Sequence, residues 1–435
     1  MKFYNREKET ALLENIAKRS LETAQMTFVV GRRRVGKTAL LNKVFSAENA
    51  LYFFVEKKNE ALLCEEFQEE IRQKLGAAVF GLSRFKDVFS LLMDLSQKQH
   101  FTLIIDEFQE FGNINSAIYS EMQNVWDSKK NASKINLVLC GSVYSLMTKI
   151  FQGSKEPLFG RATAQLKLKI FDIQTLKEIL HDYYPSYTNE DLLAFYLFTG
   201  GVAKYVELLA GAKAFTKKKI LHEIFSENSF FLNEGKNVLI DEFGKDYGNY
   251  FSILSLIASS RTSRSEMESM MQTSLGGHLD RLETEYNLIK KLRPFGAKEG
   301  SRSNKYAIED NFLNFWFRFI YKYRSAVEIG RFDYVRDIVE RDYETYSGLV
   351  LEKYFRQQFV ESKQFIYIGS YWDRKSENEI DIIAIRDDNK AVAVEVKRQK
   401  KNYNAENFAL KIEHLKTKVL RGYDVEQICL SLEDM

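Results

Sequence analysis

Short apolar runs separated by helical patterns predict an α/β chain that begins with a parallel sheet. The runs are rich in β-branched and aromatic residues and are only five or six residues long, which favours buried strands over buried helices. They cover residues 26–30, 51–55, 101–105, 135–140 and 165–170. Between them, apolar residues recur at helical spacing, as at Leu40, Leu41 and Phe45. Strands that alternate with helices in this way are typical of parallel sheets covered on both faces.

The first predicted strand runs directly into the sequence GRRRVGKT, residues 31–38, and a helix follows. Gly31 and Gly36 allow the backbone to approach a ligand closely, and the helix N-terminus directs N–H groups at an anion. Lys37 would then reach the β- and γ-phosphates, and Thr38 would ligate Mg²⁺. Strand, loop and helix together predict a site for ATP and Mg²⁺. The residues expected to contact the nucleotide are Gly31, Arg34, Gly36, Lys37, Thr38, Ala39 and Ser142.

A later strand of the same domain ends in two carboxylates, Asp106 and Glu107. Beside a phosphate-binding loop, the first would hold the Mg²⁺ shell and the second would orient or deprotonate the attacking water. Ser142 follows the next strand and is a candidate sensor of the γ-phosphate. Arg161, just before the fifth predicted strand, could act as an arginine finger, but it could equally cap a helix or pair with a surface acid. Arg34 is also open, since it could face phosphate, a partner or water.

The middle of the chain predicts a helical lid and then a winged helix-turn-helix. Helical patterns fill much of residues 173–246, and three further helices precede two strand-like segments, 287–292 and 304–308. The hairpin between these strands is the wing, and it carries most of the basic residues. They are Lys290, Lys291, Arg293, Lys298, Arg302 and Lys305. The third helix could read DNA, although its exposed charges are mixed, and the module could instead pack against the ATP-binding core.

The C-terminal residues predict a second candidate catalytic site. Asp381 lies on one strand of a predicted hairpin, and Glu395 and Lys397 lie two positions apart on the returning strand, hence on one face. Two carboxylates and a lysine on one face can hold a divalent metal and position the water that attacks a phosphodiester. Glu352 lies on the apolar stripe of a preceding helix, where a carboxylate is costly unless it is paired or linked to a metal. The same charges could also simply alternate along a half-exposed hairpin.

Composition narrows the class of protein without identifying its partner. The length of 435 residues suggests about three domains, and a hydrophobic content of 45% is ample for packed cores. A net charge of +3 gives no global preference for nucleic acid, so the basic residues that follow Lys397 must carry that argument locally. Widely spaced cysteines, the lack of a signal-peptide pattern and the lack of a long uncharged apolar run predict a cytoplasmic protein without a membrane partner.

Taken together, GRRRVGKT, LIIDE, LCGS, PLFGRAT and TGGVAKY resemble the predicted archaeal and bacterial ATPases of the AAA/STAND-related P-loop branch. The C-terminal segments WDRKSENEIDIIAI and AVAVEVKRQ are similar to the PD-(D/E)xK core of restriction endonucleases and Holliday-junction resolvases. This resemblance implies that Asp381, Glu395 and Lys397 form a nuclease site assisted by Glu352. The proline of the motif is absent, because Ile380 precedes Asp381. We therefore expect an ATPase core (1–172), a helical lid (173–246), a winged helix with a connecting helix (247–325) and a restriction-endonuclease-like α/β domain (326–435).

The leading hypothesis is an ATPase coupled to a metal-dependent DNA nuclease, with ATP, Mg²⁺ and DNA as its ligands. The alternative is an ATP-gated switch whose C-terminal domain binds nucleic acid or protein without cleaving it. A homo-oligomer or a protein partner is compatible with either hypothesis, and an arginine finger that acts in trans would require an oligomer.

Overall fold

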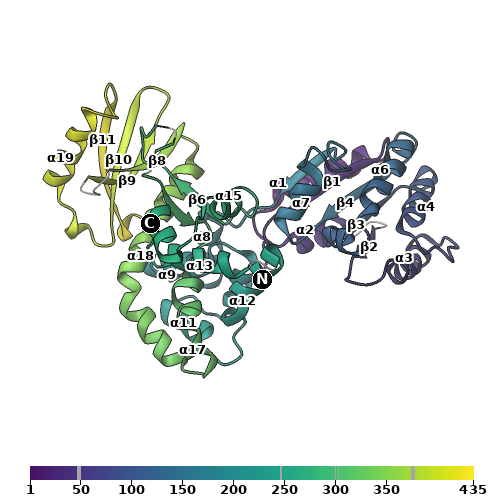
Figure 1. The fold of residues 1–435 in the computed structure, drawn as a ribbon, viewed down its shortest axis with the longest axis horizontal. Helices are drawn as coiled ribbons and strands as arrows, with labels where there is room; N and C mark the ends of the chain where they lie inside the picture. The colour runs from purple at the N-terminus through teal and green to yellow at the C-terminus, as the bar shows by residue number, and fades with distance from the viewer. Residues whose placement is uncertain (47–49, 245–246, 299, 302, 374–377) are drawn as a thin grey trace. The chain divides into compact units, whose positions relative to one another are not determined.

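The computed structural model describes residues 1–46, 50–244, 247–298, 300–301, 303–373 and 378–435. Arg302 of the predicted wing and residues 374–377 of the predicted nuclease segment lie outside the described residues. The chain divides into two compact units, Lys2–Ile170 and Phe171–Met435, shown in Figure 1 from purple to yellow along the sequence.

Within the described part of the first unit, five parallel strands form one sheet in the order β2-β3-β4-β1-β5. The strands are β1 (Gln25–Val30), β2 (Ala50–Phe54), β3 (Phe101–Asp106), β4 (Ile135–Cys140) and β5 (Ala164–Lys167). The helices are α1 (Glu7–Arg19), α2 (Lys37–Phe45), α3 (Glu60–Leu75), α4 (Phe85–Lys98), η1 (Phe108–Glu110), α5 (Phe111–Ile114), α6 (Ala117–Lys129) and α7 (Tyr144–Gln152). The order places β4 between β1 and β3, so the segments that follow these three strands meet at one edge. The predicted parallel sheet of a P-loop fold is confirmed.

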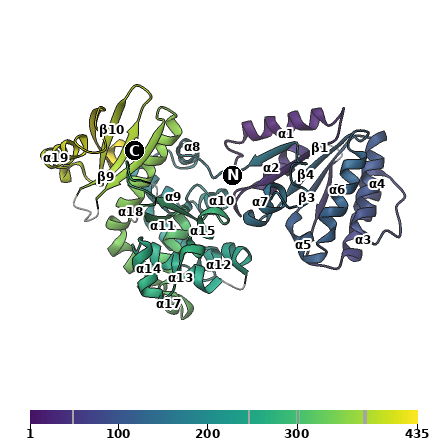
Figure 2. The same ribbon diagram turned by 45° about the horizontal axis from the view of Figure 1, so that its top comes forward.

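Helices cover both faces of this sheet, as its continuously apolar strands require. On one face, Leu40 and Leu41 of α2 share a core with Val29 of β1 and with residues of α1. On the other face, α3, α4, α6 and α7 enclose a phenylalanine-rich core in which the rings of Phe28 and Phe151 stack at 4.5 Å. Figure 2 shows α1 and α2 on one side of the sheet and α4 and α6 on the other.

The second unit begins with helices around an aromatic core. The helices are α8 (Ile173–Tyr183), α9 (Asn189–Thr199), α10 (Ala203–Gly211), α11 (Lys217–Ile224), α12 (Phe230–Phe243), α13 (Tyr247–Ala258), α14 (Arg264–Met271), α15 (Gly276–Thr284), α16 (Asn311–Phe315), the π-helical segment η3 (Trp316–Tyr321) and α17 (Arg324–Glu328). The rings of Tyr205 and Phe312 lie 4.5 Å apart, and Trp316 Nε1 donates to the carbonyl oxygen of Leu232 at 3.0 Å. The aromatic segment after Asp310 is therefore a buried connector.

Helices α13 to α15 precede an antiparallel pair of strands, which is the element order expected of a winged helix. The strands are β6 (Ile289–Leu292) and β7 (Lys305–Ile308). The wing between them packs against the C-terminal sheet, where the Phe295 N–H donates to the carbonyl oxygen of Ser370 at 2.8 Å. Lys305 forms an ion pair with Glu379 at 2.9 Å. Part of the basic wing is thus used in an interface inside this unit.

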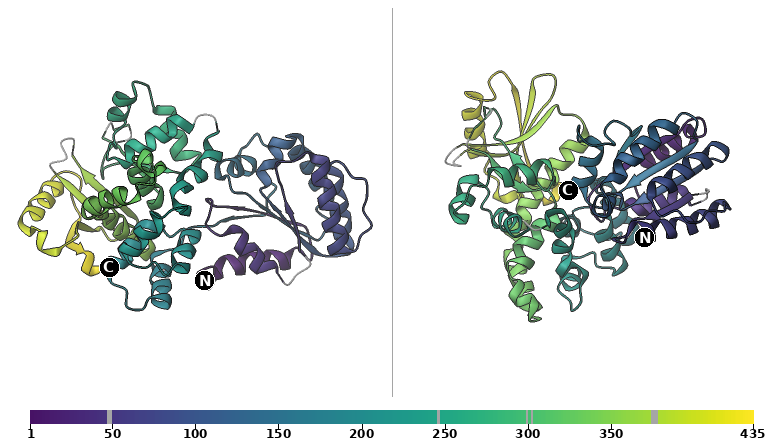
Figure 3. Two further views of the ribbon diagram at one scale, coloured as in Figure 1. Left: turned by 90° about the horizontal axis from the view of Figure 1, so that it is seen from below. Right: turned by 45° about the vertical axis from the view of Figure 1, so that its right-hand side comes forward.

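The described C-terminal strands form a four-stranded sheet in the order β11-β10-β9-β8. The elements are α18 (Phe332–Ser362), β8 (Tyr367–Trp372), β9 (Glu379–Ile385), β10 (Lys390–Lys397), η4 (Lys400–Asn402), α19 (Ala405–Lys416), β11 (Asp424–Ser431) and η5 (Leu432–Asp434). Strands β8, β9 and β10 are antiparallel neighbours, and β11 is parallel to β10. Helix α18, green in the right panel of Figure 3, runs from η3 to this sheet and contacts β8, β9 and β10. Across the described residues, no helix combines the length and the apolar character that a membrane crossing needs.

Candidate nucleotide site and candidate metal site

The GRRRVGKT loop has the backbone that a phosphate-binding loop needs. Gly36 has a φ of 94°, which glycine adopts without strain, and α2 starts immediately after it at Lys37. At Gly31 a Cβ atom would lie 2.7 Å from the carbonyl oxygen of Leu168, so a larger residue would collide with the backbone. The buried Lys37 ammonium donates to the carbonyl oxygens of Gly31 (2.8 Å) and Arg32 (3.1 Å). The chain therefore wraps around a cation beside a helix N-terminus, an arrangement suited to phosphate.

Two other predicted contacts, Arg34 and Ala39, lie in the same segment. Arg34 has a φ of 74°, a conformation that is uncommon for arginine and that proteins tend to retain at ligand-binding loops. Ala39 is exposed in the first turn of α2, where backbone N–H groups lack partners within the helix. Both residues therefore belong to the loop and helix N-terminus that are predicted to bind phosphate.

Asp106, at the end of β3, accepts hydrogen bonds on both carboxylate oxygens. Oδ2 accepts from the hydroxyls of Thr38 (3.0 Å) and Tyr52 (2.5 Å), and Oδ1 accepts from the Glu107 N–H at 3.0 Å. A hydroxyl in contact with a carboxylate beside this loop suits Mg²⁺, so Thr38 and Asp106 would hold that ion. Burial, together with the bond to Asp106, raises the Tyr52 pKa far above its ordinary value, so the hydroxyl remains a donor.

Glu107 and Ser142 also meet at this edge of the sheet. The Ser142 hydroxyl donates to Glu107 Oε2 at 2.7 Å, and the Gln109 amide donates to the same oxygen at 2.5 Å. The structure therefore brings the predicted Glu107 and Ser142 together with Thr38 and Asp106. Sequence reasoning missed Gln109, although a polar residue two positions after a candidate catalytic carboxylate was a visible signal; its burial became apparent only in the structure.

Arg161 lies at a different place in this unit. Its Nε and Nη2 atoms donate to Asp127 Oδ2 at 3.1 and 3.0 Å, and Nη1 donates to the carbonyl oxygen of Phe159 at 3.0 Å. Arg161 precedes the amino end of β5, whereas Gly31 follows the carboxyl end of β1, its parallel neighbour. The two segments therefore lie at opposite edges of the sheet. The structure does not bring this arginine to the phosphate loop of its own chain.

In the second unit, Asp381, Glu395 and Lys397 lie close together where β9 begins and β10 ends. Lys397 Nζ donates to Glu395 Oε1 at 2.7 Å, and Asp381 Oδ2 accepts from the Val396 N–H at 2.7 Å. Burial raises the pKa of Asp381 to about 6; the Val396 bond opposes this rise and the Glu395 charge adds to it. Burial lowers the pKa of Lys397, but the bond to Glu395 and the nearby carboxylates outweigh it and raise that pKa overall.

Glu352, on α18, belongs to the same acidic cluster. Burial, and then the Asp381 carboxylate, raise the pKa of Glu352 to about 8. Arg356, one turn later on α18, donates to Ser370 Oγ at 2.7 Å and to the carbonyl oxygen of Asp381 at 2.9 Å. Sequence reasoning missed both Arg356 and Glu379, whose charge also acts on Glu352. Their spacings, four after Glu352 on a helix and two before Asp381 on a strand, were available signals.

A divalent metal fits part of this cluster. Glu395 Oε2 is buried and has no hydrogen-bond partner among the described residues, and Lys411 Nζ lies 3.9 Å away. Because this oxygen is buried, accepts no hydrogen bond and has only a long ion pair with Lys411, it is a suitable ligand, and Asp381 and Glu395 would hold the ion. Within the described ranges, however, no group of three or more His, Cys, Asp and Glu side chains is arranged to hold a metal.

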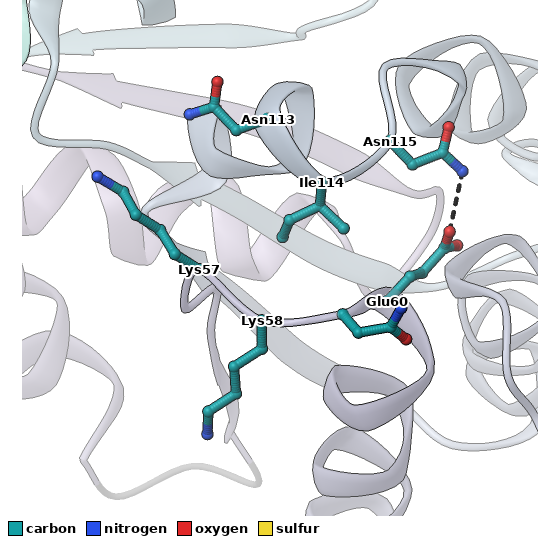
Figure 4. Close-up of a pocket in the computed structure, with 7 residues that line it drawn as sticks. Lys57, Lys58, Glu60, Asn113, Ile114 and Asn115 are labelled. Carbon is teal, nitrogen blue, oxygen red and sulfur yellow. Dashed lines mark hydrogen bonds between the residues drawn. The ribbon is translucent and has the colours of Figure 1, made fainter.

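A polar pocket of about 720 Å³ opens at the edge of the first sheet that also carries Asp106. The segments after β2 and β3 line it with Lys57, Lys58, Asn59, Glu60, Asn113, Ile114 and Asn115. Figure 4 shows the Asn115 amide turned toward Glu60, to which it donates at 2.9 Å. None of these residues belongs to the GRRRVGKT loop, so the pocket is separate from the phosphate-binding residues.

Comparison with known proteins agrees with the geometry of the first unit. An ATPase domain family described as predominantly from Archaea matches residues 3–209, and a family described as archaeal and bacterial proteins of unknown function matches residues 316–408. An uncharacterised protein of Methanocaldococcus jannaschii is 30% identical over 409 residues, which cover 91% of this chain and 87% of that protein.

Among solved structures, the Walker-type ATPase of Pyrococcus abyssi is 19% identical, with a TM-score of 0.54 and coverage of 72% of this chain and 96% of that chain. The ORC2 protein of Aeropyrum pernix is 12% identical, with a TM-score of 0.47 and coverage of 75% and 95%. The likeness to the Pyrococcus abyssi protein is one of fold. The first unit is thus a P-loop ATPase domain, and neither family description assigns a chemistry to the C-terminal residues.

Proposed function

We propose, from the premise that this chain belongs to the family of the Methanocaldococcus jannaschii protein, that it hydrolyses ATP at the GRRRVGKT loop and uses hydrolysis to control its C-terminal domain. The observation that carries the first part is the convergence of Thr38, Asp106, Glu107 and Ser142 at one edge of the sheet. This convergence supplies a metal-binding pair, a base and a polar group beside the phosphate loop.

The residues at the edge of the sheet that carries the GRRRVGKT loop have distinct tasks in hydrolysis. Lys37 and the N-terminal N–H groups of α2 bind the β- and γ-phosphates. Thr38 and Asp106 would hold Mg²⁺, which would supply charge that neutralises the phosphates. Glu107 accepts a proton from the water whose oxygen bonds to the γ-phosphorus as the bond to ADP breaks.

Turnover of ATP by the full-length protein tests this assignment. Lys37→Ala should abolish nucleotide binding, and Glu107→Gln should preserve binding while lowering kcat by about a hundredfold or more. Lys57→Ala is a matched control, because Lys57 is exposed at the same edge but outside the loop. A Lys37→Ala protein that hydrolyses ATP at the wild-type rate would exclude this site.

For the C-terminal domain, we propose a metal-dependent nuclease that acts on DNA. Its support is the buried oxygen of Glu395 that accepts no hydrogen bond among the described residues, beside Asp381 and the charged Lys397. When a divalent ion is bound, it supplies charge that stabilises an attacked phosphodiester. Lys397 would orient the attacking water, and Arg356 donates to the backbone carbonyl of Asp381.

Cleavage of linear, forked and junction DNA, with and without ATP and Mg²⁺ or Mn²⁺, tests the nuclease. Asp381→Ala should abolish cleavage. Asp388→Ala should not, because Asp388 lies in the exposed turn before β10 and pairs with Lys390. Cleavage that survives in Asp381→Ala would show that the activity arises elsewhere.

The alternative function is an ATP-gated switch whose C-terminal domain binds nucleic acid or protein without cutting. One observation favours it: among the described residues, no group of three or more His, Cys, Asp and Glu side chains is arranged to hold a metal. In that case, labelled DNA should bind in an ATP-dependent way and remain intact with every divalent metal tested.

A further inference from the structure

Gln109 is a buried polar residue whose amide nitrogen is held by a hydrogen bond and whose amide oxygen is closely packed. It lies in η1, two residues after Glu107, and is only 2% exposed. Its Nε2 atom donates to Glu107 Oε2 at 2.5 Å. Only the NH₂ end of an amide can face a carboxylate, so this contact sets the orientation of the side chain.

The other end of the amide packs against Gly141, which follows β4. A Cβ atom on Gly141 would lie 2.1 Å from Gln109 Oε1 and 2.6 Å from Met147 Cγ. Gln109 Oε1 therefore occupies the space that any side chain at position 141 would need. The same oxygen is buried and has no hydrogen-bond partner among the described residues.

An unsatisfied buried oxygen makes a purely structural role a poor explanation of this glutamine. Burying an unpaired polar atom costs free energy, and a methionine of similar length would fill the same space without that cost. What methionine lacks is the N–H donor to Glu107. The role of Gln109 therefore depends on its N–H donor to Glu107.

Ser142 shares the carboxylate oxygen that Gln109 holds. Its hydroxyl donates to Glu107 Oε2 at 2.7 Å, and its backbone N–H lies 3.4 Å from the same atom. Both side chains thus act on Oε2, and neither acts on Oε1 of Glu107. If the γ-phosphate recruits the Ser142 hydroxyl, the Gln109 amide remains as the side-chain donor that orients the carboxylate.

We propose that Gln109 is a positioning residue for ATP hydrolysis: it holds Oε2 of Glu107 so that Oε1 faces the attacking water, while Ser142 exchanges between Glu107 and the γ-phosphate. This inference rests on the proposed ATPase function. It adds a residue from outside the phosphate loop and the strand-end carboxylates. It also explains the glycine at position 141, because Gln109 fills the space that a side chain there would need.

Steady-state ATP hydrolysis by full-length Gln109→Met, Gln109→Glu and Ser142→Ala proteins tests the proposal, with KM and kcat separated. Gln109→Met keeps the volume and removes the donor, so kcat should fall by about tenfold or more while KM for ATP changes by less than about twofold. Gln73→Met is the matched control, because Gln73 donates to Glu69 in an exposed pair on α3 at 2.7 Å. Ser142→Ala should change KM as well as kcat.

The pH profile of Gln109→Glu separates positioning from packing. Two carboxylates that share a site raise the pKa of one of them, and the protonated form can donate as the amide does. The rate of this variant, relative to wild type, should therefore rise as pH falls. A loss that is equal at all pH values would contradict the proposal.

The controls also distinguish failure of the inference from failure of the ATPase assignment. If wild type hydrolyses ATP and Gln109→Met retains its kcat, the positioning role is wrong and the ATPase stands. If KM alone rises, Gln109 serves nucleotide binding and the proposal is equally wrong. If wild type is no more active than Lys37→Ala, both conclusions fall together.

Discussion

Replacing Glu352 by glutamine tests the acidic cluster through the pH dependence of stability. Burial raises the pKa of Glu352 to about 8 in the folded protein, against an ordinary value of 4.5. Below both values, the carboxyl is protonated in the folded and the unfolded state, and the shift has no effect on stability. Between them, the unfolded state releases its proton first, so the free energy of unfolding falls as pH rises and levels off above the folded pKa. Glutamine does not titrate and removes this dependence.

The pKa difference sets the size of the effect. A rise from 4.5 to about 8, at roughly 1.4 kcal/mol per unit, corresponds to an upper limit of about 5 kcal/mol. Glu352 retains some exposure, and its titration is linked to that of Asp381, so we expect about 2 kcal/mol of this limit to be measured. The variant should therefore be more stable than wild type by about that amount above pH 8 and by little near pH 5.

Urea unfolding of the full-length protein, followed by tryptophan fluorescence across this pH range, measures the difference. Glu340→Gln is the matched control, because Glu340 is an exposed carboxylate on the same helix, α18. The control should leave the pH dependence unchanged. If Glu352→Gln is destabilised equally at low and high pH, the carboxyl serves as an ionised hydrogen-bond partner, and the reasoning from burial is refuted.

Three further substitutions probe other parts of the chain. Tyr52→Phe removes a donor to Asp106, so the Mg²⁺ concentration for half-maximal ATP hydrolysis should rise severalfold, as measured by metal titration; an unchanged requirement would separate Tyr52 from the metal site. Trp372→Phe leaves the carbonyl oxygen of Ser303 without its 2.8 Å bond and should lower the free energy of unfolding by about 1–2 kcal/mol in urea titrations. Arg161→Ala should leave turnover of dilute protein unchanged, and a loss that appears only at high protein concentration would indicate action in trans.

The nucleotide site of the first unit could be predicted from sequence because the motifs that indicate it are local. Strand, glycine-bounded loop, lysine and helix follow one another within about 20 residues, and each part has a defined physical task. Tyr52 could not be found in this way. It reaches Asp106 only because β2 pairs with β3, which lies some 50 residues later, and the pairing order of strands is not written in any one of them. Arg161 shows the converse, since its position before a strand of a parallel sheet already implied the edge opposite the phosphate loop.

The C-terminal cluster was partly accessible for the same reason. Alternation along β9 and β10 was sufficient to place Asp381, Glu395 and Lys397 near one another. It was not sufficient for the environment of Glu352, because the pKa of that carboxyl depends on how α18 packs against three strands. Packing of that kind comes from long-range contacts, which single-sequence periodicity does not contain.

The wing shows why a division of the chain into modules, made from sequence, misses contacts between those modules. Its Phe295 N–H donates to the carbonyl oxygen of Ser370, at an irregularity in the pairing of β8 with β9. The hydroxyl of Ser370 donates to the carbonyl oxygen of Asp381 at 2.8 Å, and Arg356 donates to both groups. One residue thus joins the wing to the backbone of the candidate metal ligand. Because Lys305 is paired with Glu379 in the same interface, the wing supports the C-terminal site as much as it offers charge to a nucleic acid.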